Sequence, residues 1–329
     1  MKSHIPVLYF AALLILFAIG CEKDKNQNEN HIINTSGETI ASYQVAKEEI
    51  LRLIPSEYIE AARNNLHIAY QHTSHGTHVS RGMFGLPDYK QGDANLFGIT
   101  NNNPTANKLD FRDLAMQNYA ASGTSAVDLS ADETAFVQAT RNYLDDPENV
   151  EINVVMWSWC SINGHDVTGN YLPGMQALIN EYGPGGSKVG SGSGKREQAV
   201  TFIFMTGHAE AGNNVGSGKP MNQADTIIGY CQAMKYFCMD YYGIDTHSMN
   251  DQYWEDAGDN GNSDDYGGNY YVDWQQSHQL GTDYYENKSA PEGSTEYGAH
   301  NTQHITANRK AYAMWWILAR IAGWDGIAD

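Results

Sequence analysis

Short apolar runs that alternate with longer helical stretches constrain the fold of this 329-residue chain most strongly. Three of the runs, at 66–71, 152–159 and 199–207, have the length and composition of buried strands, and a weaker one lies at 116–122. Strands that alternate with helices form a parallel sheet, because each crossover lays a helix on one face of it. The pattern predicts an α/β fold with a doubly wound, mostly parallel sheet and long loop insertions.

Three helices are expected between and after these strands. The stretch 129–146 has Ser130 in the N-cap position and Glu133 three residues later, the pattern of a capping box. A second helix is expected over 222–239. The last, over 305–324, has an apolar face and contains basic residues, so we expect a packed surface helix and not a membrane span.

The N-terminus has the pattern of an export signal. Lys2 precedes an apolar run at 5–19, which is shorter than the roughly 20 residues of a membrane span. The run ends in AIGC, which resembles the lipobox of bacterial lipoproteins, so residues 1–20 are expected to be removed and Cys21 to be lipidated. The alternative is an ordinary signal peptide in which Cys21 is incidental.

The rest of the chain is expected to consist of a tether and one domain. Residues 21–42 are poor in apolar and aromatic side chains, which predicts a flexible tether. Residues 43–329 suffice for one large α/β domain, in which 248–298 form an aromatic and acidic insertion. A charged tether after a lipidated cysteine resembles the surface-export signal of Bacteroidetes lipoproteins, which implies an outer-membrane, cell-surface location.

The charge balance and the cysteines exclude several classes of site. Twenty basic against 39 acidic residues give a net charge of −19, and such a surface repels the phosphates of nucleic acids. Cys160, Cys231 and Cys238 match no zinc-binding spacing. If the last two share a helix, they lie about 10 Å apart along its axis, too far for a disulfide, so core positions are expected.

Polar residues follow each predicted strand, at the edge of the sheet where doubly wound folds carry their sites. The segments concerned are 72–78, 122–124, 160–163 and 207–210. Ser74 lies in the turn from the first strand into a helix, where a serine hydroxyl is exposed and can act as a nucleophile. The alternative is that Ser74 only caps the following helix.

In the same order along the chain, these segments resemble the SGNH or GDSL-type hydrolases, a flavodoxin-like superfamily of serine esterases and lipases. IAYQHTS resembles the first family block, with Ser74 as the nucleophile, and SGTSAVDL the second, with Gly123 as the oxyanion glycine. NTQHITANRKAYA resembles the last block, which nominates His304 as base and Asn301 in place of the usual Asp. In the third block Cys160 replaces the oxyanion Asn, and Asn163 lies three residues on.

The resemblance implies a lipid-anchored serine hydrolase that cleaves a carboxylic ester, without cofactor or metal. Its substrate would be a small ester or an acyl group on an extracellular polysaccharide. His304 would take the proton of Ser74, and backbone N–H groups of Ser74 and Gly123, with Asn163, would hold the oxyanion. Candidate substrate-binding residues are His72, His75, His208, Trp254 and Tyr271. Aromatic rings of the insertion can stack on sugars or merely pack the loop.

Three alternatives remain open. The first is a metal-dependent hydrolase in which ligands come from His72, His75, His78, His208, Glu210, His300 and His304. The second is a surface glycan-binding lipoprotein whose catalytic residues have decayed on the same scaffold. The third is that the acidic run 255–265 binds calcium, although it lacks the EF-hand spacing. It is also open whether Asp245 and His247 belong to the functional site or to a polar loop.

Overall fold

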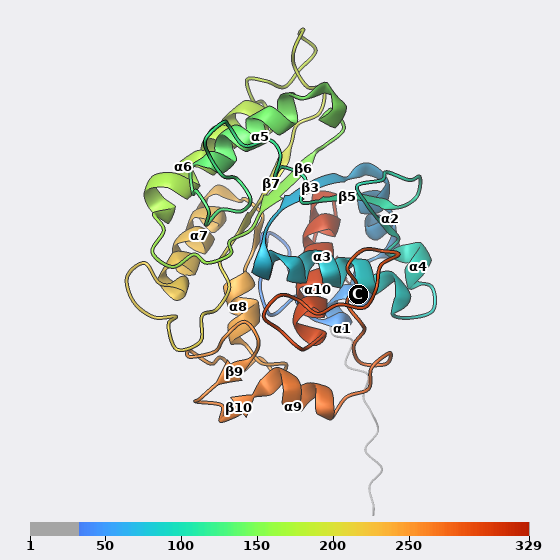
Figure 1. Ribbon diagram of the computed structural model, residues 1–329. Coiled ribbons are helices and arrows are strands. Elements are labelled where there is room, and N and C mark those ends of the chain that lie inside the picture. Colours follow the sequence, from blue (N-terminus) through green and yellow to red (C-terminus); the bar gives the residue numbers. More distant parts are fainter. Residues whose placement is uncertain (1–32, 329) are drawn as a thin grey trace, which may run out of the picture. The chain divides into compact units, whose positions relative to one another are not determined.

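A seven-stranded sheet, parallel throughout, forms the centre of the computed structural model, which describes residues 33–328 (Figure 1). The strand order is β2-β8-β7-β6-β3-β5-β4. The strands are β2 Ile40–Ala41, β3 His67–Gln71, β4 Ile99–Asn101, β5 Leu109–Asp113, β6 Val154–Trp157, β7 Thr201–Met205 and β8 Cys238–Met239. The predicted parallel α/β sheet is confirmed. The order reverses at β3, because β5 lies on one side of it and β6 on the other, and sites of such sheets form at the strand ends beside this point.

Helices cover both faces of the sheet. On one face lie α1 Glu48–Leu53, α2 Ser56–Asn65, α3 Thr77–Gly85 and α10 Ile305–Ile321, and on the other α5 Ala135–Asp145, α6 Leu172–Tyr182 and α7 Pro220–Met234. Successive strand residues point to opposite faces and so feed two separate apolar cores. In β3, Ile68 and Tyr70 join the core that contains α10, whereas Ala69 joins the core beneath α5 and α6.

Helix α10 is buried on all sides, so the expected surface helix is wrong. Every residue from Ile305 to Ala319 is buried. Its basic side chains are paired inside the fold: Arg309 donates to the carbonyls of Ile244 and His247, and Lys310 pairs with Asp245. Helix α8, at Tyr241–Thr246, and the insertion together cover the polar side of α10, which its amphipathic pattern could not reveal. Within residues 33–328, no helix is both long and apolar enough to cross a membrane.

Two expected elements on the side of α5 differ from the structure. The expected strand at 116–122 forms turns, and the nearest strand of the sheet, β5, begins seven residues earlier, at Leu109. Helix α5 begins at Ala135, and Asp132, not Ser130, accepts hydrogen bonds from the backbone of the first turn. The Ser130 hydroxyl instead accepts the backbone N–H groups of residues 160 and 161, and so ties this loop to the end of β6.

The expected helix over 222–239 is in fact a helix followed by a strand. Helix α7 ends at Met234 because Lys235 adopts a left-handed φ of 57°, and β8 follows at Cys238–Met239. Cys231 and Cys238 therefore lie on different elements, although both are buried free thiols, as expected of core cysteines. Burial and the neighbouring Cys231 thiol raise the pKa of Cys238, so it stays a neutral thiol.

The folded region begins earlier than the expected tether boundary at residue 42. Strand β2 belongs to the main sheet, and β1 Ile33–Asn34 pairs with β11 Ile327–Ala328. The predicted signal peptide and Cys21 lie outside the described residues.

The insertion at 248–298 contains short elements joined by long loops. They are β9 Asn262–Ser263, β10 Gly268–Asn269 and α9 Tyr270–Gln276. Figure 1 shows this segment beside α8 Tyr241–Thr246, which follows β8. The remaining short helices and turns are α4 Asp93–Leu96, η1 Ser74–Gly76, η2 Leu86–Asp88, η3 Pro147–Asn149 and η4 Val167–Tyr171. Because the insertion follows the carboxyl end of β8 through α8, it is placed to add residues to the edge where sites form.

Candidate metal centre

Three side chains with metal-binding atoms meet beyond the carboxyl ends of β3 and β7. His75 follows β3, His208 follows β7, and Asp259 comes from the insertion; one ligand atom from each lies within 4.8 Å of the other two. Nε2 of His75 lies 3.5 Å from Oδ2 of Asp259. Two ligands of one tetrahedral zinc ion lie about 3.4 Å apart, given bonds of about 2.0–2.1 Å. The group therefore needs little movement to hold such an ion.

The turn after β3 sets the position of His75. Ser74 has a backbone φ of 30°, outside the range that residues other than glycine usually adopt. Gly76 packs so closely that a Cβ there would lie 2.3 Å from atoms of both His72 and Ser158, so only glycine fits. The hydroxyl of Tyr241 donates to the His75 carbonyl at 2.8 Å. These contacts fix the backbone that carries the imidazole.

Backbone contacts set the tautomer of His208. Its Nδ1 lies 2.8 Å from the carbonyl oxygen of Ala209 and must donate a proton to it. Neutral imidazole then carries its lone pair on Nε2, as a metal ligand requires. The same Ala209 carbonyl accepts the N–H of Asp259 at 3.1 Å, and the Ala209 N–H donates to Asp245 at 3.2 Å. One residue thus aligns two candidate ligands.

Asp259 has the surroundings of a carboxylate that lacks its cation. The residue is 8% exposed, and its Oδ2 is buried without a hydrogen-bond partner among the described residues. Burial, together with the charge of Asp245, raises the pKa of Asp259 to about 8. Burial, with His208 and His300 nearby, lowers the pKa of His75 to about 3. A neutral imidazole and a buried carboxylate with one oxygen lacking a hydrogen bond among the described residues are suited to a divalent ion.

His300 completes the histidine cluster from the exposed side. Its ring centroid lies 4.9 Å from that of His75, whose other face stacks on His208 at 3.6 Å. His300 is exposed and has a left-handed φ of 58°. Neither of its ring nitrogens is hydrogen-bonded to a residue in 33–328, so this imidazole is available to exchange protons with a substrate.

The predicted nucleophile and base are not in contact. The Ser74 hydroxyl has no hydrogen-bond partner within residues 33–328, and no hydrogen bond or ring contact joins it to His304. Nδ1 of His304 accepts the Asn287 N–H at 3.2 Å, and the ring stacks on Tyr297. Asn301, nominated in the Asp position, accepts a backbone N–H through Oδ1 at 2.7 Å. The pairing of Ser74 with His304 stays a prediction.

The predicted oxyanion donors have other surroundings. Gly123 lies in an exposed loop, with nothing within 4 Å of where its Cβ would be. The Asn163 amide donates to Glu210 at 3.2 Å, and Glu210 also accepts the Ser161 hydroxyl at 2.5 Å. Glu210 is thus held at the end of β6, two residues beyond His208.

Other nominated residues have structural contacts. His72 pairs with Asp113 at 2.7 Å, and His78 lies 3.0 Å from the Ala299 carbonyl. Tyr271 is fully buried and donates to the Ile244 carbonyl.

The loop residues left open by the sequence also have contacts. Trp254 is half-buried and packs against Tyr266. Nδ1 of His247 lies 2.8 Å from the Gly243 carbonyl. In the 255–265 run, the Asp256 carboxylate accepts the Ser263 hydroxyl and two backbone N–H groups.

The sequence singled out two of the three candidate ligands and missed the third. His75 and His208 follow strands, but Asp259 lies in an acidic stretch whose only recognisable template was a calcium loop. The sequence did contain one indication of a further ligand. No carboxylate lies at a fixed spacing from the two histidines, so a carboxylate ligand had to come from a distant segment. Comparison of the chain with protein-family models, curated proteins and solved structures finds no match.

Proposed function

We propose that this protein is a metal-dependent hydrolase whose ion is held by His75, His208 and Asp259. The observation that carries the proposal is the convergence of three ligand atoms within 4.8 Å, together with the buried Oδ2 of Asp259, which has no hydrogen-bond partner within residues 33–328. Two imidazoles and one carboxylate, with a fourth position left open, are the ligand set of catalytic zinc sites. The absence of a thiolate from the group favours zinc or a similar transition ion over copper(I).

The residues around the ion have separate roles in this proposal. His75, His208 and Asp259 would hold the ion, which would supply a bound water of lowered pKa and a Lewis acid for the carbonyl of the substrate. His300 takes up and returns protons at the exposed side, since its ring lies beside His75 and has free nitrogens. The Ser74 hydroxyl lies one residue before a ligand and is free to donate to the substrate. We propose a carboxylic ester as the bond cleaved, in a small ester or an acylated polysaccharide.

Inhibitor selectivity tests this proposal against the nearest competitor. That competitor is an SGNH-like serine hydrolase with Ser74 as nucleophile. The strained φ of 30° at Ser74 favours it, since strained backbone conformations are common at functional sites. We expect the full chain to bind one zinc ion, to hydrolyse aryl acetates, and to lose that activity on removal of the metal with dipicolinate.

Zinc should restore the activity, and a fluorophosphonate should not label the protein. If the fluorophosphonate labels the wild type but not Ser74→Ala, and dipicolinate leaves ester hydrolysis unchanged, the serine mechanism replaces the metal mechanism. The two mechanisms make opposite predictions in both assays, because a serine nucleophile needs a base and oxyanion donors but no ion.

We propose in addition that lipid on Cys21 holds the protein to a membrane, at the outer surface of the cell. Support comes from the short apolar run after Lys2 and from the AIGC sequence at its end. Cys21→Ser is expected to move the protein from the membrane fraction to the soluble fraction or to leave its signal uncut. Labelled palmitate that still enters the Ser variant would contradict this anchoring.

A further inference from the structure

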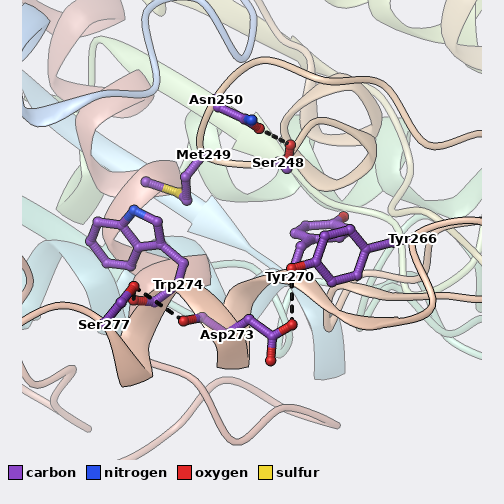
Figure 2. Close-up of a pocket in the computed structure, with 8 residues that line it drawn as sticks. All are labelled: Ser248, Met249, Asn250, Tyr266, Tyr270, Asp273, Trp274 and Ser277. Carbon is purple, nitrogen blue, oxygen red and sulfur yellow. Dashed lines mark hydrogen bonds between the residues drawn. The ribbon is translucent and has the colours of Figure 1, made fainter.

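A hollow lies in the insertion, built around one face of α9. The cavity has a volume of about 340 Å³, near the lower end for small-molecule sites. Figure 2 shows Trp274 on one side of it and Tyr266 with Tyr270 on the other. Four of its residues recur at helical spacing along α9: Tyr270, Asp273, Trp274 and Ser277. Tyr270 packs in the buried cluster of the insertion, whereas Asp273, Trp274 and the C-cap residue Ser277 face the open cavity.

The rings form walls that stand at an angle to one another. Tyr266 and Tyr270 meet edge to face, with centroids 5.8 Å apart and planes at 86°. The outer face of Trp274 is supported by His278, stacked at 3.8 Å. Met249 lies over Trp274 from the loop that follows α8 (Figure 2). Supported aromatic faces of this kind offer apolar area to a flat ligand at little cost in side-chain entropy.

Unpaired polar groups surround these rings. Tyr266 donates its hydroxyl to one carboxylate oxygen of Asp273 at 2.9 Å, and the other oxygen has no partner within 33–328. Asn250 accepts the Ser248 hydroxyl at 2.6 Å, and its amide N–H groups are unpaired within the same residues. Asp273, Asn250 and Ser277 are exposed at the rim. The cavity therefore offers both acceptors and donors beside apolar faces.

We infer that this cavity binds one pyranose ring of an uncharged polysaccharide. A pyranose has apolar C–H faces for the partly exposed rings of Trp274 and Tyr266, and hydroxyls for Asp273 and Asn250, so it matches both kinds of surface. The net charge of −19 and the free oxygen of Asp273 disfavour anionic sugars. A methylated ammonium group would suit the rings and the carboxylate, but it is small for 340 Å³ and leaves Asn250 unpaired.

This site adds substrate recognition to the proposed function and does not depend on the metal. Tyr270 connects the two regions, since its ring lines the cavity while its hydroxyl donates to the carbonyl of Asp245, whose carboxylate holds Ala209. The cavity and the candidate metal centre are thus joined by one continuous chain of hydrogen bonds, which ends at His208.

Calorimetric titration of the dipicolinate-treated full chain tests the inference. The ligands are neutral hexaoses of β-1,4-glucose, β-1,4-mannose, β-1,4-xylose and β-1,3-glucose, with choline as the competing chemistry. At least one hexaose is expected to bind, and Trp274→Ala to weaken it by at least about tenfold, the loss expected when a stacking ring is removed. Tyr253→Ala, which removes an exposed ring of the same insertion outside the cavity, is the matched control and should bind as wild type.

Three results would overturn the inference of a sugar site. They are no hexaose binding at about 10 mM, a concentration well above the Kd of ordinary specific sites; equal hexaose binding by Trp274→Ala and wild type; or saturable binding of choline alone. Because the titration uses metal-free protein, failure of the metal proposal leaves its outcome unchanged. Hexaose binding without zinc binding or hydrolysis would identify a glycan-binding lipoprotein.

Discussion

His208→Ala and Asp259→Asn should each abolish zinc binding and lower ester hydrolysis by more than about 100-fold, since even residues that only orient a ligand contribute about 10–100-fold. Each substitution removes one of three ligand atoms within 4.8 Å of one another. Equilibrium dialysis against zinc and turnover of an aryl acetate measure the two losses. The affinity loss follows from coordination, because two remaining ligands do not hold the ion against water.

Asp259→Asn separates a metal role from a merely structural one. Among the described residues, the Asp259 oxygen that faces His75 is buried without a hydrogen-bond partner, so the metal-free wild type gains nothing from its charge. The metal-free Asn variant should therefore unfold at a temperature no lower than that of the metal-free wild type. Loss of activity together with a clear loss of metal-free stability would indicate that Asp259 supports the fold instead.

His67→Gln is the matched control for the histidine substitutions. His67 begins β3, at the opposite end of the strand from the turn that carries His75, and pairs with Asp110 at 2.9 Å. The variant should bind zinc and hydrolyse ester as wild type does. Equal losses in His67→Gln and His208→Ala would mean that histidine substitutions act through stability, and the metal assignment would fail.

The sheet was predictable because its central strands are uninterrupted apolar runs. Strands β3, β6 and β7 are buried on both faces, and such strands show little alternation of polar and apolar residues. Strand β5 was missed because three of its five residues, Asp110, Arg112 and Asp113, are charged, although Arg112 pairs with Asp110 at 3.2 Å. The expected helix over 222–239 included strand β8, because β8 has only two residues and begins four residues after the last residue of α7.

The candidate site was only half predictable, because its parts come from distant segments. The strand-end rule identified His75 and His208, since the carboxyl ends of parallel strands share one edge. It could not place Asp259, which reaches this edge through the fold of the insertion. Nor could it show that His304, at the start of α10, is hydrogen-bonded to Asn287. Spacing within a motif fixes local geometry, whereas the distance between motifs depends on tertiary packing.

Breaking the buried pair of Lys310 and Asp245 should have the largest effect on stability. Both side chains are fully buried and in direct contact, and Lys310 also lies over the ring of Tyr241 at 4.5 Å. Burial lowers the pKa of Lys310 and raises that of Asp245, so each charge depends on the other. Lys310→Met leaves an unpaired carboxylate inside the protein and should cost about 3–5 kcal/mol in the free energy of unfolding.

The double variant Lys310→Met/Asp245→Asn should recover most of that loss. Met fills the volume of the lysine stem, and Asn keeps an oxygen for the Ala209 N–H, the contact that aligns His208 with Asp259. Asp245→Asn alone leaves a buried, unpaired ammonium group and should be destabilised as much as Lys310→Met. The sum of the two single losses in unfolding free energy should therefore exceed the loss in the double variant by several kcal/mol, on the order of the loss from breaking one buried pair. Urea unfolding of the four proteins measures this coupling, and zinc affinity of the double variant reports whether Ala209 is still aligned. Additive costs would mean that the two side chains do not depend on each other, and that the edge of the sheet is held by contacts other than this ion pair.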